Sequence, residues 1–66
     1  MVKCHLSKIM GERKVKISEL ARATGLNRST LTSLYNETAM RIELDTLEKL
    51  CSYFNCEIGD LLQILN

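Results

Sequence analysis

The stretch KISELARATGLNRSTLTSLYNE, Lys16–Glu37, decides the fold of this chain. Its apolar residues recur at three- and four-residue steps before Gly25 and again after it, which is the spacing of one helix face. A glycine just past a helix end can adopt the left-handed conformation at no steric cost, so Gly25 separates two short helices. We therefore expect one helix over Ile17–Thr24 and a second that is capped by Asn27 and runs to about Asn36.

The second of these helices carries an unusual surface. Leu31, Leu34 and Tyr35 face one way, while the other side holds small polar and basic residues, namely Arg28, Ser29, Thr32, Ser33 and Asn36. A solvated helix more often carries Glu and Lys, because Ser and Thr favour helices less. Small hydroxyl and amide groups can bond to phosphates or base edges without filling the major groove of DNA. A short helix, a glycine turn and a polar second helix together indicate nucleic-acid binding.

Three further helices follow from the same signals. The first is expected over about Lys3–Arg13 and the last over about Ile58–Leu65. Between them a helix should start at a capping-box-like pair, Asp45 and Glu48, and stop at Asn55. The chain is therefore expected to be all-α, a compact five-helix domain over residues 1–66 with a helix-turn-helix at about 17–36. The alternation of apolar and charged residues over 40–44 indicates at most one short strand.

Composition and charge narrow the class of protein. The chain has 66 residues, 45% of them apolar and 26% charged, which fits one globular domain. No apolar run approaches the roughly 18 residues that span a membrane, and the first residues lack the apolar core of a secretion signal, so the cytoplasm is expected. The net charge of +1 divides into +5 for residues 1–36 and −4 for residues 37–66. This division indicates an anionic partner on one side only.

The residues that could carry catalysis or bind a metal are few. Cys4, Cys51 and Cys56 are an odd number of cysteines, which favours reduced and partly buried thiols. A metal site that adds His5 is the alternative, but the 51–56 spacing is not the two-to-four-residue gap of a zinc knuckle. His5 has no acid at helical spacing, and no phosphate-binding glycine loop occurs. We expect no enzymatic activity, no cofactor, no metal and no small-molecule substrate.

Residues 17–36 resemble the helix-turn-helix of Cro- and phage-repressor-type transcriptional regulators, the XRE family. The matching residues are Leu20-Ala21, Gly25-Leu26, Leu31 and Leu34. The stretches CHLSKIMGERKVKISELARATGLNRSTLTSLYNE and RIELDTLEKLCSYFNCEIGDLL are similar to compact single-domain members, so the resemblance covers nearly the whole chain. It implies five helices, the second and third forming the DNA-reading unit.

The resemblance also implies site residues. Base-reading positions fall on Arg28, Ser29, Thr32 and Ser33, and phosphate-contacting positions fall near Lys16, Asn27 and Asn36. Two positions depart from the family pattern. Many members carry at position 17 a glutamine that clamps a phosphate, where this chain has Ile17. Many members follow the recognition helix with Asn-Gly, where this chain has Asn36-Glu37, which would put an acid close to the DNA backbone.

These observations predict a sequence-specific double-stranded DNA-binding regulator, most simply a repressor that acts by occlusion. One chain offers few base contacts, so a homodimer is expected. Its candidate interface residues are apolar, namely Met40, Ile42, Leu61, Ile64 and Leu65. The alternative is a protein-binding module, antitoxin-like or an anti-repressor partner, with weak DNA affinity and an acidic second half that docks a basic surface.

Overall fold

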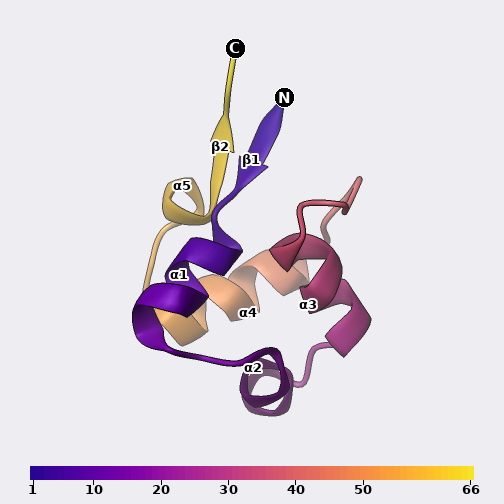
Figure 1. Cartoon of the computed structure of the whole chain (residues 1–66), viewed down its shortest axis with the longest axis vertical. Helices are drawn as coiled ribbons and strands as arrows, with labels where there is room; N and C mark the ends of the chain where they lie inside the picture. The colour runs from indigo at the N-terminus through magenta and orange to yellow at the C-terminus, as the bar shows by residue number, and fades with distance from the viewer.

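The computed structural model describes all 66 residues as five helices and a small antiparallel sheet (Figure 1). The elements in chain order are β1 (Val2–Cys4), α1 (Leu6–Arg13), α2 (Ile17–Thr24), α3 (Arg28–Tyr35), α4 (Leu44–Phe54), α5 (Ile58–Leu61) and β2 (Leu62–Ile64). In Figure 1 α4 lies behind α1, α2 and α3 lie beneath and beside them, and the two strands rise together at the opposite end. The five expected helices are present, but the all-α expectation is wrong because of the sheet.

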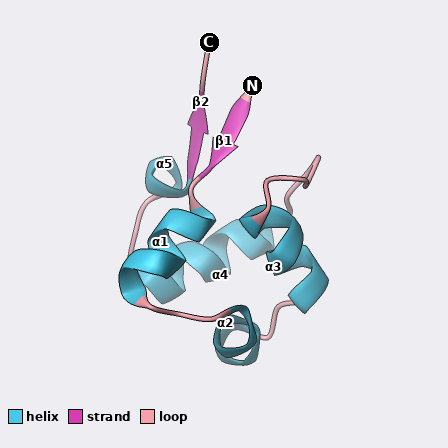
Figure 2. Ribbon diagram, viewed as in Figure 1, coloured by secondary structure: helices cyan, strands magenta, loops and turns pink.

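The two ends of the chain pair to form this sheet, which we call the terminal ribbon, β1 with β2 (Figure 2). Its register joins Val2 to Ile64 and Cys4 to Leu62. The expected helix start at Lys3 and the expected helix end at Leu65 are therefore both wrong. The β-branched residues at the ribbon tip favour strands, and pairing gives the backbone groups of each short segment a partner that neither segment could supply alone.

The core lies between the five helices, and most of its side chains come from the apolar faces that the helical spacing predicts. Its most deeply buried side chains are Leu6, Met10, Leu20, Leu31, Leu50, Phe54 and Leu61. Burial of a side chain of this size contributes about 1.5–3 kcal/mol, so these residues account for much of what holds the helices together. None of the helices combines the length and the apolar character that crossing a membrane requires.

The start of α4 differs from the expected one. Glu43 is the N-cap, and its extended backbone leads directly into Leu44. Asp45 therefore lies inside the first turn, where its carboxylate pairs with Lys49 at 3.1 Å instead of forming a capping box with Glu48. The end of α4 is as expected, because Asn55 adopts the left-handed conformation with φ 53°. Residues 40–43 form a loop, so the short strand considered there is absent.

Candidate nucleic-acid interface

The turn between α2 and α3 is closed by local hydrogen bonds. Gly25 is left-handed, with φ 74° and ψ 9°, and its N–H donates to the Ala21 carbonyl at 2.8 Å. The Thr24 hydroxyl donates to the Leu20 carbonyl at 2.6 Å and accepts from the Leu26 N–H at 3.3 Å. A side chain other than glycine would be strained at this φ, so Gly25 sets the angle between the two helices.

Asn27 caps α3 as the sequence predicts. Its backbone is extended, and its Oδ1 accepts from the Ser29 N–H at 2.8 Å and from the Ser29 hydroxyl at 2.6 Å. Caps of this kind stabilise a helix by about 0.5–2 kcal/mol. Asn27 is exposed, and its amide N–H groups form no hydrogen bond within the chain.

Helix α3 is held against the core by only one edge. Leu31 is fully buried and Leu34 is 4% exposed, whereas Arg28, Ser29 and Thr32 are exposed on the outer side. Arg28 forms no ion pair, so its guanidinium donors are free to bind a ligand. The arrangement leaves a polar helix face with an arginine at its start and no side chain above it, as a helix that enters a DNA groove requires.

Ser33 differs from the other three expected base-reading residues. It is half-buried, and its hydroxyl donates to the Ser29 carbonyl at 2.9 Å. Its own carbonyl accepts from Thr38 and Ala39, whose N–H groups fold back onto the end of α3. The structure thus brings three of the four residues together on the outer face and places Ser33 at its edge.

The three expected phosphate contacts lie at helix ends. Lys16 is the exposed N-cap of α2, and its N–H donates to the Glu19 carboxylate at 3.3 Å. Asn27 precedes α3, and Asn36 follows it as an exposed C-cap whose N–H donates to the Thr32 carbonyl at 2.9 Å. N–H groups at helix N-termini favour phosphate, so the first two positions suit this role. Ile17, beside Lys16, packs against the core instead.

Glu37 has a structural role that the sequence did not reveal. It is left-handed, with φ 59°, and its carboxylate turns toward β1. Oε2 accepts from Lys3 Nζ at 3.0 Å, and Oε1 accepts from the Cys4 N–H at 3.2 Å. The hydrogen bonds from Lys3 and from the Cys4 N–H lower the pKa of Glu37, which therefore carries a charge that is already partnered. The Glu37 carboxylate, which was expected close to the DNA backbone, is instead bound by Lys3 and the Cys4 N–H of the terminal ribbon.

The basic residues of the first half are not all free. Lys3 is paired with Glu37, and Arg13 Nη2 donates to the Phe54 carbonyl at 3.1 Å, with its guanidinium 5.9 Å from the centre of the Phe54 ring. The remaining basic side chains of that half are exposed and without ion pairs, namely Lys8, Lys14, Lys16, Arg22 and Arg28. Three of these five flank or belong to the two helices of the helix-turn-helix.

The expected interface residues divide into two groups. Met40 is 96% exposed and Ile64 is 75% exposed, and Leu65 is also on the surface. Ile42 is half-buried against the core, and Leu61 is 1% exposed and belongs to the core. Leu61 is therefore unavailable to a second chain, because the last helix ends there and turns its final side chain inward.

The remaining polar candidates lie apart from α3. The three cysteines are free thiols, and no three ligand-type side chains gather into a metal site. The His5 ring is hydrogen-bonded through Nε2 to Gln63 Oε1 at 2.8 Å, across the base of the terminal ribbon. These contacts place the single histidine in the framework of the sheet.

Comparison with known proteins agrees with this geometry. Residues 5–65 match the family model of the Cro/C1-type HTH DNA-binding domain, and the chain belongs to that family. The expected kinship with Cro- and phage-repressor-type regulators is thereby confirmed. The chain is also similar to the uncharacterized HTH-type transcriptional regulator YozG of Bacillus subtilis (strain 168), with 34% identity over 55 residues. That match covers 83% of this chain and 66% of the relative, so the chain spans just under two thirds of the relative's length.

Proposed function

We propose that the protein is a sequence-specific double-stranded DNA-binding regulator of transcription. The observation that carries the proposal is the outer face of α3, where Arg28, Ser29 and Thr32 are exposed while Leu31 and Leu34 anchor the opposite edge. Membership of a DNA-binding domain family supports the class of partner. A protein that binds DNA acts in the compartment that holds the DNA, and we propose that this compartment is the cytoplasm.

In the proposed complex α3 enters the major groove. Arg28 at its first turn reaches guanine O6 and N7, and the hydroxyl groups of Ser29 and Thr32 bond to neighbouring base edges or, for Thr32, contact a thymine methyl group. Lys16 and Asn27 bind phosphates on either side of the groove through the N-terminal ends of α2 and α3. Asn36 contributes a further phosphate contact from the far end of α3.

Operator selection from random duplex DNA tests this proposal most directly. One sequence should be enriched, and its affinity should fall steeply with salt because phosphate contacts release counterions. A shallow salt dependence without an enriched sequence would contradict sequence-specific binding. If no duplex bound even at low salt, the protein-binding alternative would replace the DNA proposal.

We further propose that the protein binds DNA as a homodimer and represses by occlusion. Val2 and Ile64 are cross-strand partners on one face of the terminal ribbon, and Met40 stands exposed in the neighbouring loop. A cavity of about 250 Å³ with mostly apolar walls lies between the ribbon, the end of α3 and this loop. A second copy would cover this apolar surface and place two α3 helices one turn of DNA apart, about 34–36 Å.

Sedimentation equilibrium at micromolar concentration tests the dimer. The expected result is a dimer in the unmodified chain and a monomer in the double variant Met40→Ser, Ile64→Ser, with operator affinity lowered in parallel. Leu44→Ser, at an exposed position that does not line this cavity, should leave both unchanged. If the unmodified chain sediments as a monomer, the proposed dimer is wrong. If expression of a reporter gene placed behind the operator rises when the protein binds, the proposed repression is wrong.

A further inference from the structure

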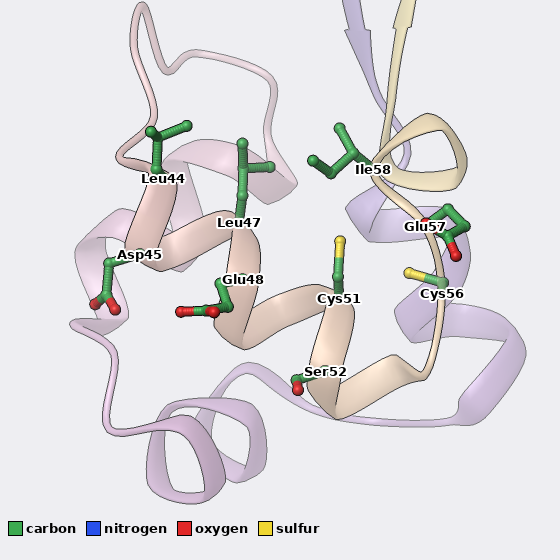
Figure 3. A pocket seen from close by; sticks show the side chains of 9 residues that line it. All are labelled: Leu44, Asp45, Leu47, Glu48, Cys51, Ser52, Cys56, Glu57 and Ile58. Atoms are coloured by element: carbon green, nitrogen blue, oxygen red, sulfur yellow. The ribbon is translucent and has the colours of Figure 1, made fainter.

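The end of α4 places two thiols side by side. The Cys56 N–H donates to the Cys51 carbonyl at 3.0 Å, and the Asn55 N–H donates to the Ser52 carbonyl at 3.3 Å. Together with the left-handed Asn55 these two bonds form a Schellman stop, in which the side chains of the first and last residues meet. Those residues are Cys51 and Cys56. In Figure 3 both sulfurs lie at one groove, with the Cys51 side chain pointing into the groove from α4 and the Cys56 sulfur pointing toward Cys51.

The groove that exposes these thiols has a definite chemical character. It lies between α4 and α5 and has a volume of about 690 Å³. Its apolar walls include Leu47 and Ile58, and its rim carries three carboxylates (Figure 3). Asp45 is paired with Lys49 at 3.1 Å, whereas Glu48 and Glu57 form no ion pair. Two negative charges at the rim are therefore not neutralised by a basic side chain, and such charges attract cations.

The reactivity of the pair follows from its surroundings. Burial raises the pKa of the Cys56 thiol, the neighbouring Cys51 and Asp60 raise it further, and Arg13 opposes them. At neutral pH Cys56 is therefore mostly protonated, which slows its attack on a dissolved oxidant. Once one of the two thiols has formed a mixed disulfide with a small molecule, the neighbouring thiol can attack that disulfide within the same protein.

We propose that Cys51 and Cys56 form a dithiol site that reacts with small cationic disulfides and closes to an intramolecular disulfide. The thiolate of one cysteine attacks a sulfur of the small disulfide, forming a mixed disulfide and releasing one small thiol. The thiolate of the other cysteine then attacks the protein sulfur of that mixed disulfide and releases the second small thiol. The two protein thiols lose two electrons, the small disulfide gains them, and the two thiol protons end on the released thiols.

The disulfide would secure the helix stop. A covalent link between residues 51 and 56 removes conformations from the unfolded chain, and the folded chain already holds the two sulfurs together. The expected effect is a rise of roughly 5–15 °C in the Tm of the oxidised protein relative to the reduced one. The outer face of α3 takes no part in this reaction.

The test treats the intact, reduced chain with cystamine, a small dicationic disulfide, and then digests the acid-quenched protein with trypsin. Lys49 is the last basic residue, so both thiols fall in the peptide 50–66, whereas Cys4 falls in the peptide 4–8. The expected product is a peptide 50–66 that is lighter by two hydrogen atoms and free of cysteamine adducts. Stable adducts on both cysteines, a link to Cys4 or to a second chain, or reaction only in urea would overturn the site.

Matched variants distinguish the effect of the neighbouring thiol from the effect of the carboxylates at the rim of the groove. Cys56→Ser should retain a stable cysteamine adduct on Cys51, because no neighbouring sulfur remains to displace it. The rate with cystamine relative to that with the anionic glutathione disulfide should fall by about threefold in the double variant Glu48→Gln, Glu57→Gln. An unchanged ratio would overturn the preference for cations. Circular dichroism of each variant before reaction, with the unmodified chain as reference, confirms that the comparison is made on folded protein.

Discussion

Helices α3 and α4 lie in the same small domain but are stabilised in different ways. α4 is eleven residues long, buries Thr46, Leu47, Leu50 and Phe54, and carries an ion pair on its surface. α3 has eight residues, buries only Leu31 and Leu34, and exposes residues of modest helix propensity without an ion pair. α4 thus serves as the framework, whereas α3 depends on two leucines and a cap and leaves its outer face free for a ligand.

The largest expected effect comes from removing the anchor of α3. Leu31→Ala should lower the free energy of unfolding by about 2–5 kcal/mol, because it leaves a cavity under the helix. It should also weaken operator binding per folded molecule, since α3 loses its position. Urea denaturation and titration of a selected operator measure the two effects.

Leu50→Ala is the matched control in α4. The two leucines are equally buried, so a similar loss of stability is expected. The folded fraction should nevertheless bind the operator with nearly unchanged affinity. Equal losses of affinity in both variants would show that α3 and α4 do not differ in the proposed way.

Arg28→Ala should leave stability nearly unchanged and cost about 1–3 kcal/mol of operator binding at a single base position. Lys49→Ala removes a basic residue from α4 and should have little effect on DNA binding. Competition titrations with operators altered one base pair at a time measure both. Unchanged binding by the Arg28 variant would exclude this residue as a base reader.

Asn27→Ala should lower the free energy of unfolding by about 0.5–2 kcal/mol, since the Ser29 N–H loses its acceptor. Asn27→Gly should lower the free energy of unfolding by only a few tenths of a kcal/mol. At the start of α4 the Glu43 side chain forms no cap hydrogen bond, so Glu43→Ala should have almost no effect. Chemical denaturation of the three variants measures these losses of stability. If Glu43→Ala lowered the free energy of unfolding as much as Asn27→Ala does, α3 would not depend on its cap more than α4 does.

The smallest expected effect concerns Glu37, just beyond α3. Lys3 and the Cys4 N–H lower its pKa below the ordinary value of 4.5. Its contribution to stability is therefore present above the ordinary value and is lost as the pH falls through the lowered one. Glu37→Gln should be slightly less stable than the unmodified chain at pH 7, and the difference should shrink in strong acid. A difference that persists at low pH would assign the effect to packing.

Local signals account for the parts of the fold that the sequence predicted. Gly25 and Asn27 are a stop and a start signal two residues apart, and they defined α2 and α3 correctly because each acts through its own backbone. The apolar spacing likewise placed Leu31 and Leu34 on the buried side of α3. The placement of Arg28, Ser29 and Thr32 on one exposed face follows from helix geometry alone.

The rest depends on contacts between distant parts of the chain. Val2–Cys4 and Leu62–Ile64 have apolar residues that fit a helix or a strand, and only their mutual pairing decides between the two. The bond between Lys3 and Glu37 joins residues 34 positions apart, which no local pattern reveals. Leu61 was placed on the surface because the expected helix was too long, and its burial follows from where α5 ends.

The terminal ribbon also has a consequence for the order of folding. The helices can form from contacts between near neighbours, whereas β1 and β2 join the first and last residues of the chain and must close the longest possible loop. The ribbon is therefore expected to form late, after the helices have brought the two ends together. Because three residues in each strand bury little surface, it should also be the first part to open, and its amide protons should exchange well before those of α4.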